Sequence, residues 1–404
     1  MTEYYDALET RSATDRSKAM AQELPRLLNI AKNRSPHFAE VLAEFEPAAI
    51  TTREALARLP VLRKSELTER QKERPPFGGL TTVPLGELAR VFQSPGPIYE
   101  PQARTPDYWR FARAMHAAGF RRGELVHNTF AYHFTPAGHM FEAGAEALGC
   151  PVFPAGVGQT ELQVRAIAEL RPVGYTGTPS FLNIILQKAD ELGEDVSSLR
   201  KGLVTGEPLP TSLRERLQAR GIELYQCYGT ADLGLIAYET EAREGLVVDE
   251  GVIVEIVRPG TGEPVPEGEV GEVLVTVLNP EYPLIRFATG DLSAVLSGVS
   301  PCGRTNMRIK GWLGRADQTT KVRGMFVHPS QVNDVVRRHA ELVRARLVVT
   351  REHDNDVMTL YCETAQPAEG LEAAITESIR EVCKLRGEVR LVAPGELAND
   401  GKVI

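Results

Sequence analysis

An acidic side chain that follows an apolar run stands out in the segment RFATGD, residues 286–291. The apolar run from Tyr282 to Ile285 predicts a strand that enters a turn, and the turn presents the carboxylate of Asp291. An ionised carboxylate only accepts hydrogen bonds, through two oxygens. Asp291 is therefore suited to accept hydrogen bonds from both hydroxyl groups of a ribose.

A second charged group, GRAD at residues 314–317, pairs an arginine with an acidic residue in a short turn bounded by glycine. The guanidinium of Arg315 is a fixed cation, and such a cation beside a hinge suits a phosphate contact. The segment KVRG follows at residues 321–324. Taken alone, this pattern is more typical of a charged hairpin with a solvated face than of a phosphate site.

A third segment, YGTAD at residues 228–232, follows apolar residues typical of a strand. The ring of Tyr228 can stack on adenine, and the carboxylate of Asp232 can ligate the Mg²⁺ of a nucleotide. Upstream, LVTGEP at residues 203–208 predicts a strand that runs into a glycine turn.

These segments resemble the adenylate-forming ligase superfamily, and more closely the phenylacetate–coenzyme A ligase family. The matching motifs are PLIR-x-x-TGD, PCGRT and GRAD-x-x-x-KVRG, and the resemblance runs from LPVLRKSEL near Leu59 to Gly401-Lys402. It implies ATP-dependent activation of a carboxylic acid, aromatic or otherwise apolar, to an acyl-adenylate and then to a coenzyme A thioester. ATP or AMP, Mg²⁺ and coenzyme A are the implied cofactors.

The resemblance also implies roles for single residues. Lys402 and Asp232 are the implied catalytic residues: Lys402 reaches the substrate carboxylate and the α-phosphate, and Asp232 holds Mg²⁺. Asp317 is the implied hinge of a mobile C-terminal domain. Asp291 binds the ribose and Arg315 the phosphate, within a set of nucleotide contacts made up of Gly206, Glu207, Pro208, Tyr228, Gly229, Thr230, Asp291, Arg304 and Arg315.

An aromatic segment is the candidate acyl pocket. His133, Phe134 and His139 follow a predicted strand and are suited to line a pocket for the acid, although packing of the loop explains them equally well.

The chain departs from the family at the expected phosphate-binding loop, VFQSPGPIYEP at residues 91–101. Pro95 and Pro97 lack amide donors, and Glu100 stands where the family has a lysine. A carboxylate beside a triphosphate is repulsive. Two alternatives therefore stay open: an adenylating enzyme with a carrier-protein or amine acceptor, and an acyl- or nucleotide-binding homologue deficient in ATP chemistry.

Family members often carry a Cys/His zinc site in the region that follows. The matching positions here are Thr240, Val247 and Ser300, which leaves only Cys302. Because one thiolate cannot close a tetrahedral site, we predict no zinc site.

The elements that must position these residues predict an α/β fold. Short strands and helices alternate between residues 108 and 176, which indicates parallel βαβ units, and VIVEIV and GEVGEVLVTV predict an antiparallel β subdomain. Two helical and three strand-like segments follow Asp317. We expect a large N-terminal domain at residues 1–316 and a small α+β cap at residues 317–404.

The amino-acid composition limits the kinds of molecule that the protein is expected to bind. The 404 residues carry a formal net charge of −8, which argues against binding to nucleic acid or anionic membranes. No apolar run approaches the ~20 residues of a membrane-spanning helix, and the polar N-terminus does not resemble a signal peptide. Five cysteines without a CxxC pair indicate a reducing, cytoplasmic compartment. A homodimer is left open.

Overall fold

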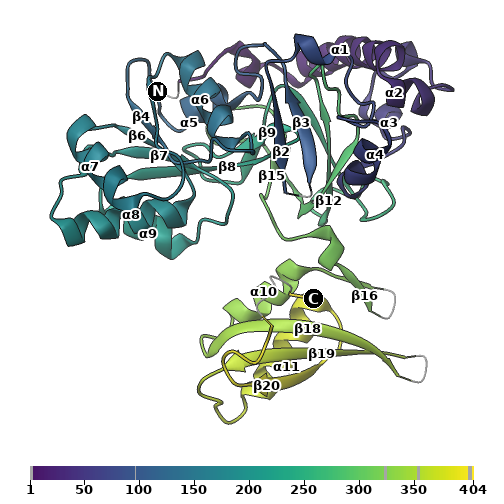
Figure 1. Ribbon diagram of the computed structural model, residues 1–404. Coiled ribbons are helices and arrows are strands. Elements are labelled where there is room, and N and C mark those ends of the chain that lie inside the picture. The colour runs from purple at the N-terminus through teal and green to yellow at the C-terminus, as the bar shows by residue number, and fades with distance from the viewer. Residues whose placement is uncertain (1–2, 96, 323–324, 353–354, 399–402) are drawn as a thin grey trace. The chain divides into compact units, whose positions relative to one another are not determined.

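The computed structural model describes residues 3–95, 97–322, 325–352, 355–398 and 403–404 (Figure 1). The chain divides into two compact units, described separately below. Unit 1 comprises Met1–Thr289 and Ala294–Gly311, and unit 2 comprises Gly290–Ser293 and Trp312–Ile404. Unit 2 thus begins before Asp317, and the hinge at that residue stays a prediction.

A nine-stranded sheet forms the centre of unit 1, in the order β14-β15-β10-β9-β8-β7-β6-β4-β5. The strands from β8 to β5 are parallel, which confirms the predicted βαβ units, and the others pair antiparallel. The strands are β4 (Val126–Asn128), β5 (Val152–Pro154), β6 (Gly174–Gly177), β7 (Lys201–Val204), β8 (Glu223–Thr230), β9 (Gly234–Tyr238), β10 (Leu246–Val248), β14 (Val295–Leu296) and β15 (Arg308–Ile309).

Helices cover both faces of this sheet because successive strand side chains point to opposite faces. Leu203 belongs to the core beneath α5 and α6, whereas Val204 belongs to the core beneath the other three helices. The strand-to-helix loops therefore gather where the parallel strands end, which is where open α/β sheets bind ligands. The helices are α5 (Phe111–Ala117), α6 (Ala137–Leu148), α7 (Thr160–Leu170), α8 (Pro179–Leu192) and α9 (Thr211–Ala219) (Figure 1).

A second sheet, in the order β1-β13-β12-β11, packs against the N-terminal helices through a shared apolar core. The expected antiparallel pairing of β11 with β12 is confirmed. Pro36 begins a helix, which suits its fixed φ. The elements are α1 (Ala13–Arg34), α2 (Pro36–Val41), α3 (Arg53–Leu56), α4 (Leu67–Glu73), β1 (Leu62–Arg63), β11 (Val252–Val257), β12 (Gly271–Val277) and β13 (Phe287–Ser293).

The predicted strand at Tyr282–Ile285 is wrong. The strand in this region is β13, which starts at Phe287, so Asp291 lies within a strand rather than in a turn after one. Tyr282, Leu284 and Ile285 are buried core residues, and burial alone explains their apolar character.

Unit 2 has the expected α+β composition. Strand β18 pairs antiparallel with β19, and β19 pairs parallel with β20 after the crossover through α11. Val332, Leu347, Leu360 and Ile375 lie in its core. The elements are β16 (Thr320–Val322), β17 (Met325–Val327), α10 (Pro329–Arg337), β18 (Leu342–Glu352), β19 (Asn355–Thr364), α11 (Leu371–Cys383) and β20 (Glu388–Val392).

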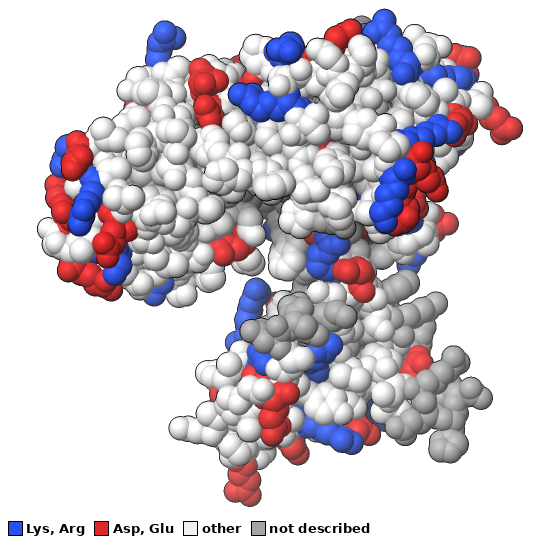
Figure 2. All heavy atoms as spheres, in the orientation of Figure 1, with Lys and Arg blue, Asp and Glu red and all other residues white. Residues whose placement is uncertain are grey.

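The surface of unit 1 carries mixed charge. On the face drawn in Figure 2, basic and acidic side chains lie intermixed near the margins of the unit, with wide uncharged areas between them. Within the described residues, no helix is both long enough and apolar enough to cross a bilayer. All five cysteines are buried and free of disulfide bonds.

The segment that precedes α1 is held on unit 1 by buried polar contacts. Glu9 is only 1% exposed and accepts hydrogen bonds from the backbone N–H of Tyr5 at 2.9 Å, the hydroxyl of Tyr238 at 2.7 Å and Nε of Arg304 at 3.2 Å. A carboxylate this deeply buried is stable only when it is paired and hydrogen-bonded.

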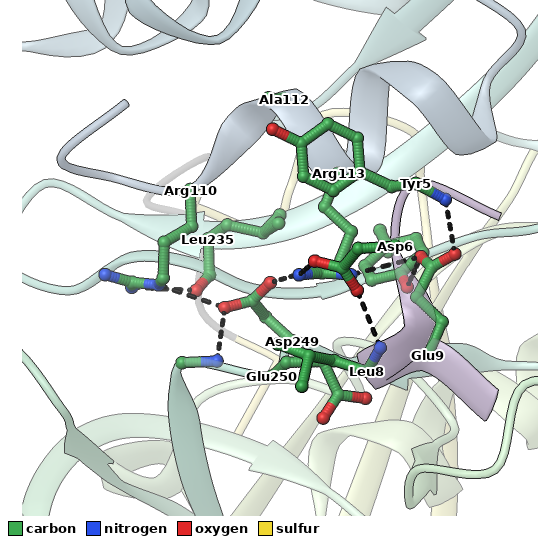
Figure 3. A network of polar contacts seen from close by, with 12 residues as sticks. Tyr5, Asp6, Leu8, Glu9, Arg110, Ala112, Arg113, Leu235, Asp249 and Glu250 are labelled. Carbon is green, nitrogen blue, oxygen red and sulfur yellow. Dashed lines mark hydrogen bonds and ion pairs between the residues drawn. The ribbon is translucent and has the colours of Figure 1, made fainter. Parts of the chain in front are cut away.

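Arg113 extends this network along α5 (Figure 3). Its guanidinium donates to both oxygens of Asp6, at 2.9 and 2.7 Å, and lies 3.3 Å from Asp249. Asp249 also accepts a hydrogen bond from Nε of Arg110 at 3.0 Å. The N-terminal segment is thereby linked to the main sheet.

Replacing Glu9 tests how much this network stabilises the fold. Glu9→Ala leaves the buried Arg304 without its main partner, so the free energy of unfolding should fall by about 3–5 kcal/mol. The measurement is urea denaturation followed by circular dichroism. The matched control is Glu23→Ala, which removes an exposed partner of Arg26 and should cost less than about 1 kcal/mol. Equal effects of the two variants would contradict a structural role for the network.

Candidate active site

Two predicted nucleotide-binding loops lie together where the parallel strands of unit 1 end. Gly206–Pro208 directly follows β7, and Tyr228–Thr230 ends the neighbouring strand β8. Gly206 has a φ of +87°, a conformation that favours glycine. The loop after β7 is tied to the start of α8, because Oε1 of Glu207 accepts the backbone N–H of Ser180 at 2.6 Å.

The β8 residues are held by their own hydrogen bonds. The hydroxyl of Tyr228 donates to Oγ1 of Thr289 at 3.3 Å, which fixes the ring orientation. Oγ1 of Thr230 accepts the backbone N–H of Leu233 at 3.2 Å and so stabilises the turn that carries Asp232. Gly229 lies at a register shift between β8 and β9.

Asp232 is buried beside this turn and has one open oxygen. Its Oδ2 accepts a hydrogen bond from Nζ of Lys64 at 2.5 Å, and within the described residues its Oδ1 has no hydrogen-bond partner. A buried carboxylate with a free oxygen fits a hard cation such as Mg²⁺, which prefers oxygen ligands.

Lys64 was not among the predicted site residues. It directly follows β1, which pairs in parallel with β13. Its position lies within the LPVLRKSEL stretch that carries the family resemblance, but 168 residues separate it from Asp232. The contact is made in the tertiary structure, where β1 is held in its place by the pairing with β13.

The expected phosphate-binding loop is a β-hairpin. Strands β2 (Arg90–Ser94) and β3 (Ile98–Gln102) pair antiparallel, so the interpretation of residues 91–101 as a loop is wrong for all but its tip. Glu100 is also not an exposed charge, because its side chain is buried and hydrogen-bonded to Ser94 across the hairpin. The alternation of strand side chains turns Glu100 inward and Tyr99 outward.

Burial changes the charge of Glu100. Desolvation, reinforced by the negative charge of Asp232, raises the pKa of this carboxyl to about 8. At neutral pH the group is therefore mostly protonated, and the expected repulsion of a triphosphate is weaker than an exposed carboxylate would produce.

Unit 2 brings two other predicted residues into direct contact. Oδ1 of Asp291 accepts hydrogen bonds from Nη1 of Arg315 and from Nε1 of Trp312, each at 3.1 Å. Arg315 lies so close to Gly290 that a Cβ there would be 2.6 Å from its Nη2. Trp312 was not predicted, and the only signal was its place just before the GRAD motif.

The predicted hinge residue is a neighbour of this pair. Nε of Arg315 lies 3.4 Å from Oδ1 of Asp317, and the carboxylate of Asp317 is largely exposed. The predicted catalytic residue Lys402 lies outside the described residues.

Arg304 takes a different place from the other predicted nucleotide contacts. It is fully buried in the network around Glu9, and its guanidinium also faces the rings of Tyr4 and Tyr238. A nucleotide contact would require breaking these interactions, so we leave Arg304 out of the site.

The three candidate pocket residues do not share one environment. The ring of His139 packs against Phe92 and Tyr132, at centroid distances of 5.3 and 5.1 Å. His133 is exposed, and Phe134 is 76% exposed with a φ of +60°. Only His139 therefore belongs to a packed aromatic group.

Three of the residues that match the family zinc site, Thr240, Ser300 and Cys302, form a small polar group. Oγ of Ser300 lies 3.1 Å from the thiol of Cys302, and Val247 is buried in β10. Burial raises the pKa of this thiol, but hydrogen bonds from Ser300, Thr240 and Arg304 outweigh burial and lower it. Within the described residues, no group of three or more His, Cys, Asp or Glu side chains is arranged to hold a metal ion.

Comparison with known proteins identifies the class of enzyme that this chain resembles. A family model described as "AMP-binding enzyme" matches residues 109–277, and one described as "AMP-binding enzyme C-terminal domain" matches residues 324–403. The first match covers Gly206–Pro208 and Tyr228–Asp232.

Relatives that match over most of their length identify the family. Phenylacetate-coenzyme A ligase of Thermus thermophilus is 32% identical over 382 residues, which cover 90% of this chain and 85% of that protein. The enzyme of the same name from Escherichia coli strain K12 is 29% identical over 404 residues, with coverages of 95% and 89%. The chain therefore belongs to the phenylacetate–coenzyme A ligase family of AMP-binding enzymes.

Solved structures agree on the fold. A crystal structure of an open conformation of 2-hydroxyisobutyryl-CoA ligase, in complex with 2-HIB-AMP and CoA, has a TM-score of 0.85 and 27% identity. The match covers 97% of this chain and 91% of that one. The expected fold class is confirmed.

The raised pKa of Glu100 predicts a pH dependence of stability. The native state keeps a proton that the unfolded chain loses above its usual pKa of 4.5, up to the native pKa of about 8. Stability should therefore fall as pH rises through this window, by up to about 1.4 kcal/mol per pH unit. Glu100→Gln mimics the protonated group and cannot ionise, so its stability should lack the pH dependence that Glu100 causes.

The measurement is urea denaturation of both proteins at pH 5, 6, 7 and 8. The stability of Glu100→Gln relative to the unmodified protein should increase steadily with pH. A constant difference across the range would show that Glu100 is ionised in the native state throughout.

Proposed function

We propose that this protein joins a carboxylic acid to coenzyme A in two steps driven by ATP. The observation that carries the proposal is the buried carboxylate of Asp232, whose Oδ1 has no hydrogen-bond partner among the described residues and which lies within the residues matched by the AMP-binding model. Membership in a family whose named relatives are phenylacetate-coenzyme A ligases supports the same reaction.

In the first step, a carboxylate oxygen of the acid attacks the α-phosphorus of ATP. The bond between this phosphorus and the bridging oxygen breaks, and pyrophosphate leaves with the electron pair. In the second step, the deprotonated thiol of coenzyme A attacks the acyl carbon, and AMP leaves. Both steps depend mostly on positioning and on charge stabilisation.

Unit 1 supplies the adenine and metal contacts in this proposal. The backbone of Gly206–Pro208 borders the adenine, the ring of Tyr228 stacks on it, and Gly229 and Thr230 shape the turn. Asp232 is positioned to hold Mg²⁺, which would neutralise phosphate charge during the first step. The free oxygen of Asp232 and its burial fit this ion.

Residues of unit 2 have roles of their own in this proposal. Asp291 accepts the ribose hydroxyls, and Arg315 contacts the phosphate. Asp291 already accepts two N–H donors through one oxygen, which orients its carboxylate as an acceptor. Lys402 would stabilise charge in the first step, and rotation of residues 317–404 about Asp317 would then admit the thiol.

The acid is proposed to be aromatic or otherwise apolar, as the names of the relatives suggest. The packed rings of Phe92, Tyr132 and His139 suit one wall of its pocket, with His133 and Phe134 on the adjoining loop. Five free cysteines fit a reducing, cytoplasmic compartment. A homodimer remains an open part of this proposal.

The proline-containing tip of the β2–β3 hairpin favours a second candidate function. Pro95 and Pro97 cannot donate hydrogen bonds to phosphate oxygens, which is compatible with a nucleotide- or acyl-binding homologue without ATP chemistry. An enzyme that passes the acyl group to a carrier protein or an amine is the remaining alternative.

Carboxylate-dependent exchange of pyrophosphate into ATP separates these candidates. An enzyme should incorporate labelled pyrophosphate only when a suitable acid from a panel is added. Product analysis with and without coenzyme A then identifies the acceptor. Absence of exchange with every acid, while AMP still binds, would support the binding homologue instead.

Replacing Asp291 tests the proposed ribose contact. Asp291→Ala removes the charged acceptor of two hydroxyl groups, so AMP binding measured by calorimetry should weaken by roughly 2–4 kcal/mol. The control is Asp334→Ala, which removes an exposed carboxylate of α10 from the same unit. Unchanged affinity of Asp291→Ala for AMP would rule out the assignment.

Replacing Lys402 separates the two steps. Lys402→Ala should slow adenylation by several orders of magnitude, because the ammonium would stabilise charge only in that transition state. Thioester formation from supplied acyl-adenylate should stay nearly intact. Arg380→Ala, an exposed charge of α11, should affect neither step. Equal losses in both steps would contradict the rotation of the cap.

A further inference from the structure

The β2–β3 hairpin lacks a cation for a triphosphate. No lysine or arginine occurs between Val91 and Pro101. The adjacent Arg90 is engaged, because its Nη1 donates to Oε1 of Gln102 at 3.1 Å. A triphosphate carries several negative charges, and protein sites for such groups use Lys, Arg or backbone amides. If ATP binds here, another part of the chain must supply the positive charge.

Lys64 lies close to the residues that are proposed to contact the nucleotide. It follows Arg63, which pairs with Ala288 of β13, and the next residue of β13 is Thr289, the partner of Tyr228. Lys64 thus stands at the same edge as the proposed adenine contact. Its side chain is 29% exposed, so solvent and a ligand can reach it, whereas the side chain of Asp232 is fully buried.

The segment after Lys64 also holds the hairpin. In α4, the side chain of Gln71 donates to the backbone oxygen of Tyr99 and accepts from its backbone nitrogen, both at 2.8 Å. Thr68 donates to the backbone oxygen of Pro97 at 3.4 Å. The chain from Lys64 to Gln71 therefore connects the hairpin directly with the Asp232 turn.

The charges around Lys64 are unbalanced and incompletely bonded. Two buried carboxyl groups, Asp232 and Glu100, lie close enough to influence each other and Lys64. Oδ1 of Asp232, Oε2 of Glu100 and the hydroxyl of Tyr282 are buried, and among the described residues none of these three atoms has a hydrogen-bond partner. Unpartnered buried polar atoms are costly, and such a cluster indicates a place for a polar ligand or ion.

We propose that Lys64 supplies the cation that the hairpin lacks, by binding the β- and γ-phosphates of ATP. The ammonium group pairs with Asp232 in the nucleotide-free protein and exchanges this partner for the phosphates. A lysine suits the exchange because its charge sits on a flexible four-carbon stem. Asp232 is then released to hold Mg²⁺, as the proposed function on which this inference rests requires.

Lys64 should therefore distinguish ATP from AMP, because AMP lacks the two outer phosphates. The test is a pair of calorimetric titrations, ATP and AMP, each with Mg²⁺, on the full chain. The unmodified protein should bind ATP more tightly than AMP. Lys64→Gln keeps a hydrogen-bond donor toward Asp232 but removes the charge, and should weaken ATP binding about 10-fold or more. AMP binding should stay within twofold.

Two further variants control for the fold and for general charge effects. Lys64→Arg keeps the positive charge and should retain most of the preference for ATP. Lys72→Met removes an exposed lysine of α4 that pairs with Glu69, and should bind both nucleotides like the unmodified protein. Thermal melting of each variant reports whether the fold is intact.

Three outcomes would overturn the assignment to Lys64: equal binding of ATP and AMP by the unmodified protein, equal losses for both nucleotides in Lys64→Gln, or an unchanged preference for ATP in that variant. The proposed function is tested by a separate experiment. Pyrophosphate exchange by the unmodified protein tests it, and exchange that persists while Lys64→Gln keeps its preference for ATP would reject only the role of Lys64.

Discussion

A buried carboxylate must be paired or protonated, and this constraint organises the candidate site. Asp232 is paired with Lys64, whereas Glu100 is buried beside Asp232 and takes up a proton. One lysine thus lies near two buried acids. Within the described residues, Oδ1 of Asp232 and Oε2 of Glu100 keep no hydrogen-bond partner.

The same constraint explains why the N-terminal segment matters for unit 1. Glu9, Arg113 and Asp249 are buried charges that stabilise one another, and they connect this segment to Arg110. Arg110 in turn donates to the backbone oxygens of Leu233 at 2.5 Å and Leu235 at 3.2 Å. The turn that carries Asp232 is therefore tied to this polar network through the backbone oxygen of Leu233.

Departures from the family pattern have different consequences at different positions. At the position that matches the zinc site, Cys302 contacts both Ser300 and the buried Arg304, so polar contacts occupy this place. At the position expected to bind phosphate, the segment with Pro95, Pro97 and Glu100 is a hairpin whose acid faces inward. The first change concerns stability, and the second concerns how a triphosphate is held.

The amino-acid sequence by itself determined the fold class and the family. Alternating strands and helices predicted the parallel sheet, and long ordered motifs identified the family, because both signals are local or follow chain order. It also predicted Tyr228, Asp232, Asp291 and Arg315 as site residues, since each lies in such a motif.

Only the tertiary structure decided which side chains meet and which charges are buried. Lys64 contacts Asp232 although 168 residues separate them, and Arg63 beside it pairs with Ala288; no local pattern encodes either contact. Burial, not residue type, set the protonation of Glu100 and took Arg304 into the network around Glu9. The predicted strand at Tyr282–Ile285 is wrong because core burial and strand formation favour the same apolar residues.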